Sequence, residues 1–260
     1  MPWLGLGVYR AEEGPEVEEA VRVALELGYR AVDTASMYRN ESGVGRALHA
    51  SGLPREEVFL TTKVWNSEQG YDSTLRAFEA SLKRLGVDYV DLYLIHWPVP
   101  GRYKETWRAL ERLYREGRAR AIGVSNFQIH HLEDLLAGAE VAPMVNQVEC
   151  HPRLQQRELL DFCRAHAIQL EAWAPLMRGR LSDEPTLRRI AAARGKTPAQ
   201  VMLRWNLQRG VVVIPKSVRR ERIEENAGIF DFELSEQEME ALASLERGER
   251  IGPDPDHVDF

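Results

Sequence analysis

The segment Val32-Asp33-Thr34-Ala35-Ser36-Met37-Tyr38-Arg39-Asn40-Glu41 places an acid at the end of a short apolar run and a phenol five residues further on. A helix is expected to begin just after the phenol. An aspartate at a strand end and a tyrosine on the following loop are unusual for a surface turn, but they make sense if both side chains point into one pocket. We therefore predict that Asp33 and Tyr38 belong to one functional site.

Seven other apolar runs resemble the run that ends at this segment. Several are continuously apolar rather than alternating, which is typical of a parallel sheet covered by helices. The eight predicted strands are Trp3–Tyr9, Ala31–Ala35, Val58–Trp65, Val90–Pro98, Ala121–Phe127, Met144–Pro152, Ile168–Pro175 and Gly210–Ser217.

Amphipathic helical patterns separate these runs, for example Leu75, Phe78, Leu82 and Leu85 on one face, with Gly86 where that helix should stop. No linker or composition shift divides the chain. Eight alternating units favour one α/β domain over residues 1–260, a (β/α)8 TIM barrel, rather than a doubly wound sheet. Further helices are predicted at about Lys104–Glu116, Glu184–Arg194, Pro198–Gln208 and Arg219–Ala227, and after an N-cap at Ser235.

Polar or aromatic residues lie at or near the ends of seven consecutive predicted strands. The active sites of such barrels lie at the C-terminal ends of the strands, so these residues are expected to meet at one rim. They are Asp33, Lys63, His96, Ser125 with Asn126, Gln147, Trp173, and Lys216 with Ser217.

The first residues of this set suggest proton transfer. A tyrosine has an ordinary pKa near 10, and an adjacent ammonium lowers it, so Lys63 would tune Tyr38 while Asp33 holds Lys63 charged. His96 would donate a hydrogen bond to a substrate oxygen or help to relay the proton. Each residue also has a purely structural explanation, but a buried lysine and a buried aspartate on adjacent strands need each other. No good covalent nucleophile accompanies them, so a hydride from a cofactor is the natural partner.

The segment Val212-Val213-Ile214-Pro215-Lys216-Ser217 carries the cofactor prediction, because a strand that ends in Lys-Ser and opens a helix offers N–H groups, a hydroxyl and an ammonium to a phosphate. Arg222 could contact the same phosphate or stack on an adenine. Gly5-Leu6-Gly7 lacks the third glycine of a dinucleotide fingerprint. His130-His131 and Cys150-His151 lack partners at metal-ligand spacing, so we expect no metal.

Composition limits the remaining functions. The net charge of -6 argues against binding to nucleic acid or anionic membranes. No apolar run approaches the roughly 20 residues of a membrane span, and no secretory leader is recognisable. Cys150 and Cys163 are expected to be free thiols in a reducing compartment. We therefore expect a soluble, cytoplasmic protein.

The motifs together resemble those of the aldo-keto reductase superfamily, nearly from end to end. The resemblance implies NADPH-dependent reduction of aldehydes or ketones to alcohols, with Asp33, Tyr38, Lys63 and His96 as the catalytic set and Tyr38 as general acid. The matching motifs are Leu4-Gly5-Leu6-Gly7-Val8-Tyr9, Asp33-Thr34-Ala35 through Asn40-Glu41, Thr62-Lys63, Leu94-Ile95-His96-Trp97-Pro98, Gly123-Val124-Ser125-Asn126-Phe127, Asn146-Gln147 and Ile214-Pro215-Lys216-Ser217.

The resemblance also implies the cofactor contacts. Ser125, Asn126 and Gln147 match the ligands of the nicotinamide carboxamide, Trp173 takes the place of the aromatic that stacks on the nicotinamide, and Leu176 begins the loop over the pyrophosphate. The residues that match the adenosine 2′-phosphate and adenine site, and so favour NADPH over NADH, are Lys216, Ser217, Val218, Arg222, Glu225 and Asn226. The expected cofactor set is completed by Gly7, Val8, Tyr9, Asp33 and Pro175.

Within the superfamily, Trp173-Ala174-Pro175-Leu176 and the ending Arg250-Ile251-Gly252-Pro253-Asp254-Pro255 are most similar to bacterial reductases of the 2,5-diketo-D-gluconate type. The β-hairpin that usually plugs the barrel bottom is expected to be missing, because the chain begins at the first barrel strand. The short loop after Pro98 and the brief tail after Gly252 imply an open pocket. Its expected walls are Tyr9, Trp65, His96 and Trp97, although a structural role for Trp65 is equally open.

Two other functions fit parts of this pattern. The first is an NADPH-binding sensor or regulatory subunit with little turnover, against which the intact catalytic set argues. The second is a barrel lyase or isomerase with Lys63 as a Schiff base, against which Asp33 argues by keeping that amine charged. For the reductase we expect a small carbonyl substrate, a monomer, and no nucleic-acid or membrane partner.

Overall fold

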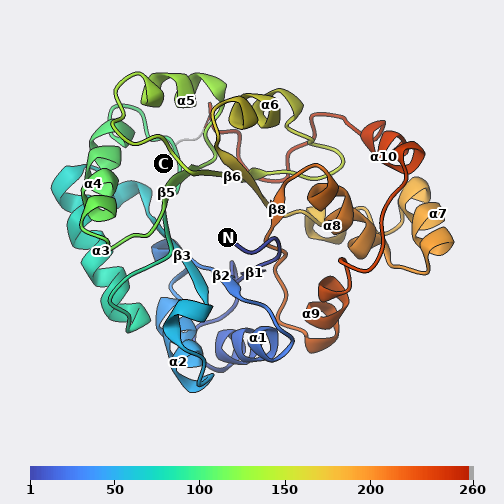
Figure 1. Ribbon diagram of the computed structural model, residues 1–260, viewed down its shortest axis with the longest axis horizontal. Coiled ribbons are helices and arrows are strands. Elements are labelled where there is room, and N and C mark those ends of the chain that lie inside the picture. Colours follow the sequence, from blue (N-terminus) through green and yellow to red (C-terminus); the bar gives the residue numbers. More distant parts are fainter. Residues whose placement is uncertain (258–260) are drawn as a thin grey trace.

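The computed structural model describes residues 1–257 and contains a sheet of eight parallel strands in sequence order (Figure 1). Every strand pairs with the next one along the chain, in parallel. The strands are β1 (Leu6–Gly7), β2 (Ala31–Asp33), β3 (Phe59–Val64), β4 (Leu92–Ile95), β5 (Ile122–Ser125), β6 (Val145–Glu149), β7 (Gln169–Trp173) and β8 (Val212–Val213).

Backbone hydrogen bonds join the first strand region to the last and close the sheet into a barrel. The N–H of Gly5 donates to the carbonyl of Val213 at 2.9 Å, and the N–H of Gly7 donates to the carbonyl of Pro215 at 3.2 Å. Gly7 is needed at this junction because a Cβ there would lie 2.8 Å from the carbonyl oxygen of Ile214. The predicted (β/α)8 barrel is therefore confirmed.

Helices surround the strands as a ring, and α7 and α10 lie outside α8 (Figure 1). The α-helices are α1 (Pro15–Glu26), α2 (Glu41–Ala50), α3 (Tyr71–Leu85), α4 (Tyr103–Arg115), α5 (Ile129–Leu136), α6 (Arg157–Ala165), α7 (Pro185–Arg194), α8 (Pro198–Gln208), α9 (Arg220–Ala227) and α10 (Glu236–Ala243). Four short 3-10 helices are η1 (Ser36–Tyr38), η2 (Arg55–Glu57), η3 (Asn66–Glu68) and η4 (Met177–Gly179).

Helix α3 illustrates how the sequence pattern produces this ring. Phe78, Leu82 and Leu85 are buried against the sheet, and each contributes about 1.5–3 kcal/mol by leaving water. Phe78 meets Tyr93 of β4 edge to face, with 4.8 Å between ring centroids. The helix ends at Gly86, whose φ of 66° is left-handed and favours glycine.

A second apolar cluster connects the outer helices to the loop after β7. Trp205 of α8, Ile190 of α7 and Leu242 of α10 are buried together in it. Met177 and Leu181 from the loop are fully buried in the same cluster. This loop is therefore attached to the outer helices, and it passes beside the C-terminal ends of the strands.

All eight predicted apolar runs contain a strand, but the strands are shorter than the runs. In the run Gly210–Ser217 only Val212–Val213 is a strand, because Pro215 has no N–H with which to continue the ladder. The capping box at Ser235 and Glu238 is present. Helices α5 and α6 were not predicted, although α5 buries Leu132 and Leu135 and α6 buries Leu159, Leu160 and Cys163. Within residues 1–257, no helix is both long and apolar enough to span a membrane.

Candidate active site

A buried lysine forms the centre of the site at the C-terminal ends of β2 and β3. Nζ of Lys63 donates to Oδ1 of Asp33 at 2.6 Å, to the carbonyl of Thr34 at 2.9 Å and to the hydroxyl of Tyr38 at 3.3 Å. The Lys63 side chain is fully buried. Because an ammonium has three protons, these three acceptors satisfy it completely.

Strand register explains why these groups meet. Asp33 is paired with Thr61 of β3, and Lys63 lies two residues beyond Thr61, so its side chain points to the same face of the sheet. Tyr38 reaches the ammonium from η1, which follows β2 directly. His96 comes just after β4, and its ring centroid lies 5.7 Å from that of Tyr38. The four predicted catalytic residues are thus brought together.

The protonation states follow from burial and from these contacts. Burial lowers the pKa of Lys63, but Asp33 and Tyr38 outweigh it and the net pKa is raised. Burial raises the pKa of Tyr38 to about 12, although Lys63 opposes this. The sequence predicted a lowered pKa for Tyr38; that net direction is wrong because burial exceeds the effect of the ammonium. Burial lowers the pKa of His96 well below its usual range, and Lys63 lowers it further.

Aromatic rings flank this centre. Tyr9 packs against Tyr38 with 5.0 Å between ring centroids, and Trp65 meets His96 edge-on at 5.1 Å. Nδ1 of His96 is buried, and no residue of the described chain forms a hydrogen bond with it. Tyr9, His96 and Trp97 line the cavity at the rim, whereas Trp65 does not and lies behind His96.

Gln147 connects this centre to a second buried acid that the sequence analysis missed. Its Nε2 donates to Oδ2 of Asp33 and to Oε2 of Glu171, both at 2.7 Å. Glu171 is buried in β7, and burial followed by the charge of Asp33 raises the pKa of its carboxyl to about 8. An acid between Leu170 and Ala172 in a predicted strand was the available signal. Two carboxyl groups and one ammonium therefore share the barrel interior.

Asn126 and Ser125 are fixed at the end of β5 beside Gln147. Asn126 has a left-handed φ of 65°, which asparagine tolerates better than most residues. Its Nδ2 donates to the carbonyl of His96 at 2.9 Å, and its Oδ1 accepts from Nε1 of Trp173 at 2.8 Å. Ser125 Oγ donates to the carbonyl of Gln147 at 2.8 Å. These hydrogen bonds hold the polar groups in place at the rim.

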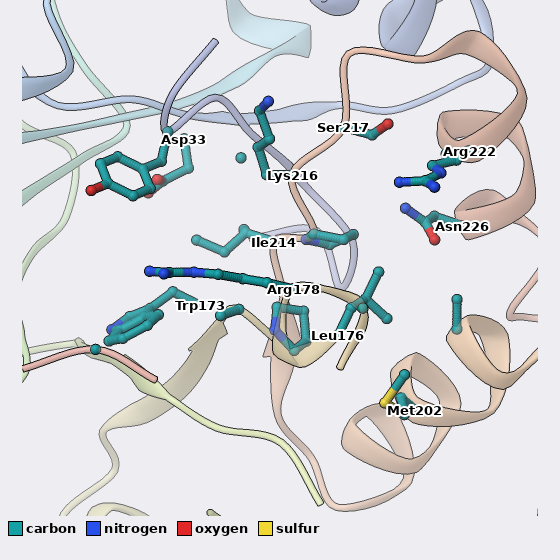
Figure 2. Close-up of a pocket in the computed structure, with 18 of the residues that line it drawn as sticks. Asp33, Trp173, Leu176, Arg178, Met202, Ile214, Lys216, Ser217, Arg222 and Asn226 are labelled. Carbon is teal, nitrogen blue, oxygen red and sulfur yellow. The ribbon is translucent and has the colours of Figure 1, made fainter. Parts of the chain in front are cut away.

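One cavity of about 960 Å³ contacts most of the predicted site (Figure 2). Four predicted residues do not line it, namely Lys63, Val8, Val218 and Trp65. Lys63 instead donates hydrogen bonds to Tyr38 and Asp33, which do line it. The predicted residues that line it are Gly7, Tyr9, Asp33, Tyr38, His96, Trp97, Ser125, Asn126, Gln147, Trp173, Pro175, Leu176, Lys216, Ser217, Arg222, Glu225 and Asn226.

The other end of this cavity is cationic. Lys216 and Arg222 are exposed, and no carboxylate within residues 1–257 forms an ion pair with either. Arg178, which the sequence analysis did not select, reaches across the cavity from η4, and its guanidinium points toward the side of Trp173 rather than toward Arg222 (Figure 2). Its φ of 52° lies in a loop where Ala174 and Met177 are also left-handed. Lys216 and Arg222 are the cations that suit the phosphates of a dinucleotide.

The C-terminal tail brings a third polar side chain to His130 and His131. Oδ1 of Asp256 lies 3.2 Å from Nε2 of His130 and 3.7 Å from Nε2 of His131, and the three groups are close enough to hold a cation. However, Nδ1 of His131 accepts from the N–H of Gln128 at 3.2 Å. In the neutral ring Nε2 then carries the proton and points it at Asp256. The geometry is therefore that of a tail contact.

Comparisons with known proteins agree over almost the whole chain. The model of the Aldo/keto reductase family matches residues 4–247. The chain is 59% identical over 260 residues to the glyoxal reductase of Bacillus subtilis (strain 168), covering 100% of this chain and 94% of that protein. It is 49% identical over 260 residues to methylglyoxal reductase DkgA of Salmonella typhimurium (strain LT2), covering 98% of this chain and 94% of that protein.

A solved structure gives the same result for the fold. A variant of Gox0644, crystallised in complex with NADPH, is similar to this chain with a TM-score of 0.94 and 48% sequence identity. The match covers 100% of this chain and 95% of that one. The likeness therefore includes both the barrel and the loops around its rim.

Proposed function

Because this chain belongs to the aldo/keto reductase family, we propose that it uses NADPH to reduce small aldehydes and ketones to alcohols, with Tyr38 as the general acid. It is an NADP-dependent oxidoreductase by family and by its likeness to an NADPH-bound structure. The observation that carries the proposed chemistry is the contact of 3.3 Å between the buried ammonium of Lys63 and the hydroxyl of Tyr38.

The protonation states suit reduction at neutral pH. Tyr38 keeps its proton, since burial raises its pKa to about 12, and the residue lines the cavity. It would donate that proton to the carbonyl oxygen, and NADPH, when bound, would supply the hydride for the carbonyl carbon. The phenolate that remains is stabilised by Lys63, which Asp33 holds in place. His96 is neutral and orients the carbonyl oxygen through a ring N–H.

The residues around the cavity fit the cofactor. The amide and hydroxyl groups of Ser125, Asn126 and Gln147 suit a carboxamide, and the indole of Trp173 offers a stacking surface beside them. Lys216 and Arg222, which pair with no carboxylate of residues 1–257, would hold the phosphates, including a 2′-phosphate. This charge is the reason to expect NADPH rather than NADH.

Small dicarbonyl compounds are the first substrates to test. Two similar proteins are named glyoxal reductase and methylglyoxal reductase, and the cavity rim beside Tyr38 carries the apolar rings of Tyr9 and Trp97. Reduction of 2,5-diketo-D-gluconate, suggested by the sequence around Trp173 and the tail, stays a prediction for the same panel.

The test is consumption of NADPH with glyoxal, methylglyoxal, an aromatic aldehyde and 2,5-diketo-D-gluconate, with NADH run in parallel. The proposal expects turnover with NADPH and much less with NADH. Equal rates with both cofactors would remove the 2′-phosphate assignment but keep the carbonyl chemistry. Binding of NADPH without consumption on any substrate would instead favour a cofactor-binding sensor.

A further inference from the structure

A buried carboxylate at the C-terminal end of β6 has no part in the chemistry described above. Glu149 is 1% exposed. It accepts hydrogen bonds from the backbone N–H of Ile251 at 2.7 Å and of Gly252 at 3.0 Å, and contacts Nε2 of His151 at 2.9 Å. Burial alone would raise the pKa of Glu149, but these donors outweigh it and lower the pKa. The carboxylate is therefore ionised at neutral pH and holds the C-terminal tail.

The tail residue held by Glu149 also touches Trp173. A Cβ on Gly252 would lie 2.4 Å from Cη2 of the indole and 3.2 Å from Oε2 of Glu149. No L side chain fits there without displacing the ring or the carboxylate. The backbone of Gly252 is thus enclosed between the acid and the indole.

A polar contact also holds the indole. Nε1 of Trp173 donates to Oδ1 of Asn126 at 2.8 Å. Glu149 and Trp173 are paired in register between β6 and β7, so the acid and the ring start from neighbouring rim positions. Trp173, Gly252 and Pro253 all line the cavity. Asn126 and the tail together therefore leave the indole little freedom.

We propose that Glu149 is a positioning residue that acts through Gly252 and holds the tail against Trp173. The tail then fixes the indole as the surface on which the nicotinamide stacks. Gly252 and Pro253 thereby become a fixed wall of the substrate cavity. This inference rests on the proposed function, because it assumes that the cofactor binds beside Trp173. His151 has a supporting role, since its Nε2 contacts Oε1, the oxygen that also accepts from the N–H of Ile251.

Two substitutions test this arrangement from opposite sides. Glu149→Gln keeps the size of the side chain, but its amide nitrogen would face a backbone N–H and only one oxygen can still accept. Gly252→Ala keeps the acid and pushes a methyl group against the indole. Gly138→Ala is the matched control, because Gly138 has no left-handed φ and a Cβ there meets nothing within 4 Å. NADPH affinity and the ratio of kcat/KM for a bulky aromatic aldehyde to that for methylglyoxal are measured in each protein.

Each single variant is expected to weaken NADPH binding by about tenfold. Glu149→Gln loses a hydrogen bond to a charged group, which is an effect of this size, and Gly252→Ala displaces the indole that the tail holds in place. Glu149→Gln should also raise the ratio for the bulky aldehyde, since the tail wall is released. The double variant should bind NADPH no worse than the weaker single variant, because both changes break the same contact. Gly138→Ala should match the wild type.

Several results would overturn the proposal. Unchanged NADPH affinity in both folded single variants would do so, as would losses that multiply in the double variant. A lower melting temperature with unchanged NADPH affinity would show that Glu149 only stabilises the fold. If Glu149→Gln does not fold, Glu149→Asp, which keeps the charge but shortens its reach to the tail, is measured in its place. A wild-type protein that neither binds nor consumes NADPH would contradict the proposed function itself, which separates that failure from this one.

Discussion

The two ends of the cavity differ in how their charges are satisfied. At the end near Tyr38, the ammonium of Lys63 is fully buried and donates three hydrogen bonds to groups of the protein. At the other end, Lys216 and Arg222 are exposed and form no ion pair within the part of the chain that the structure describes.

This difference separates chemistry from binding. A buried charge pair is costly to form and costly to break, so it holds one geometry whether or not a ligand is present. Exposed cations without partners contribute little to the fold, and their charge is available to an anionic ligand. The proton-transfer end should therefore respond to mutation in both stability and turnover, and the cationic end in ligand affinity alone.

The largest effect is expected at the buried pair. Lys63→Met leaves the carboxylate of Asp33 buried without its cation, which should lower the free energy of unfolding by about 3–5 kcal/mol and abolish measurable turnover. Thermal unfolding and NADPH consumption measure the two effects. Lys104→Met is the control, because Lys104 forms an exposed pair with Asp134 at 2.6 Å and should cost at most about 1 kcal/mol. An equal loss of unfolding free energy in the two variants would contradict the claim that the buried pair matters more for stability than the exposed pair.

The next effect belongs to the cationic end. Arg222→Ala should weaken NADPH binding about tenfold, the cost of losing a charged hydrogen bond, while stability and NADH binding stay unchanged. Arg220→Ala is the control, since Arg220 is exposed on the same helix α9 and pairs with Glu26 instead. Fluorescence titration with each cofactor measures the affinities. An equal loss for NADH would show that Arg222 does not contact the 2′-phosphate.

A pH-dependent effect is expected from Glu171. Burial raises the pKa of this carboxyl from an ordinary 4.5 to about 8. Between these two values the unfolded chain releases the proton while the folded protein keeps it, so the folded state binds more protons and stability falls as pH rises. Glu171→Gln can still accept from Gln147 but does not titrate, so its stability should decline less from pH 5 to pH 8. The free energy of unfolding of both proteins is measured by denaturant unfolding between pH 5 and pH 8. An equal decline in the two proteins would contradict this prediction.

The smallest effect on NADPH binding is expected for Arg178, because this residue is exposed to solvent where it lines the cavity. Arg178→Gln should weaken NADPH binding by about threefold, in the range of exposed ion contacts, and this loss should shrink as salt is added. A loss larger than that of Arg222→Ala would mean that the loop after β7, rather than α9, dominates phosphate binding.

The sequence predicted the barrel and the residues of the proton-transfer end because both depend on strand ends. Asp33, Lys63 and His96 close apolar runs, and parallel strands bring their C-terminal ends to one rim. The net direction of the Tyr38 pKa could not be predicted in this way, since it depends on how deeply the hydroxyl is buried.

Tertiary contacts explain most of what was missed. The role of Glu149 depends on Ile251 and Gly252 of the tail, which lie about a hundred residues later in the sequence and donate hydrogen bonds to it. Its position within a predicted strand does not indicate these contacts. Asp256 approaches His130 for the same reason. Arg178 depends on a loop with three left-handed non-glycine residues, a conformation that no hydrophobic period encodes. The roles of these residues can be recognised only in the folded chain.

The central claim is that Tyr38 donates the proton, and the most direct test is the pair of NADPH turnover and NADPH affinity in Tyr38→Phe. This substitution keeps the ring and removes only the hydroxyl that accepts from Lys63. We predict that turnover falls by about 10²–10⁴-fold, as expected when a general acid is lost, with NADPH affinity close to that of the wild type. Wild-type turnover in Tyr38→Phe would contradict the assignment of the whole proton-transfer site.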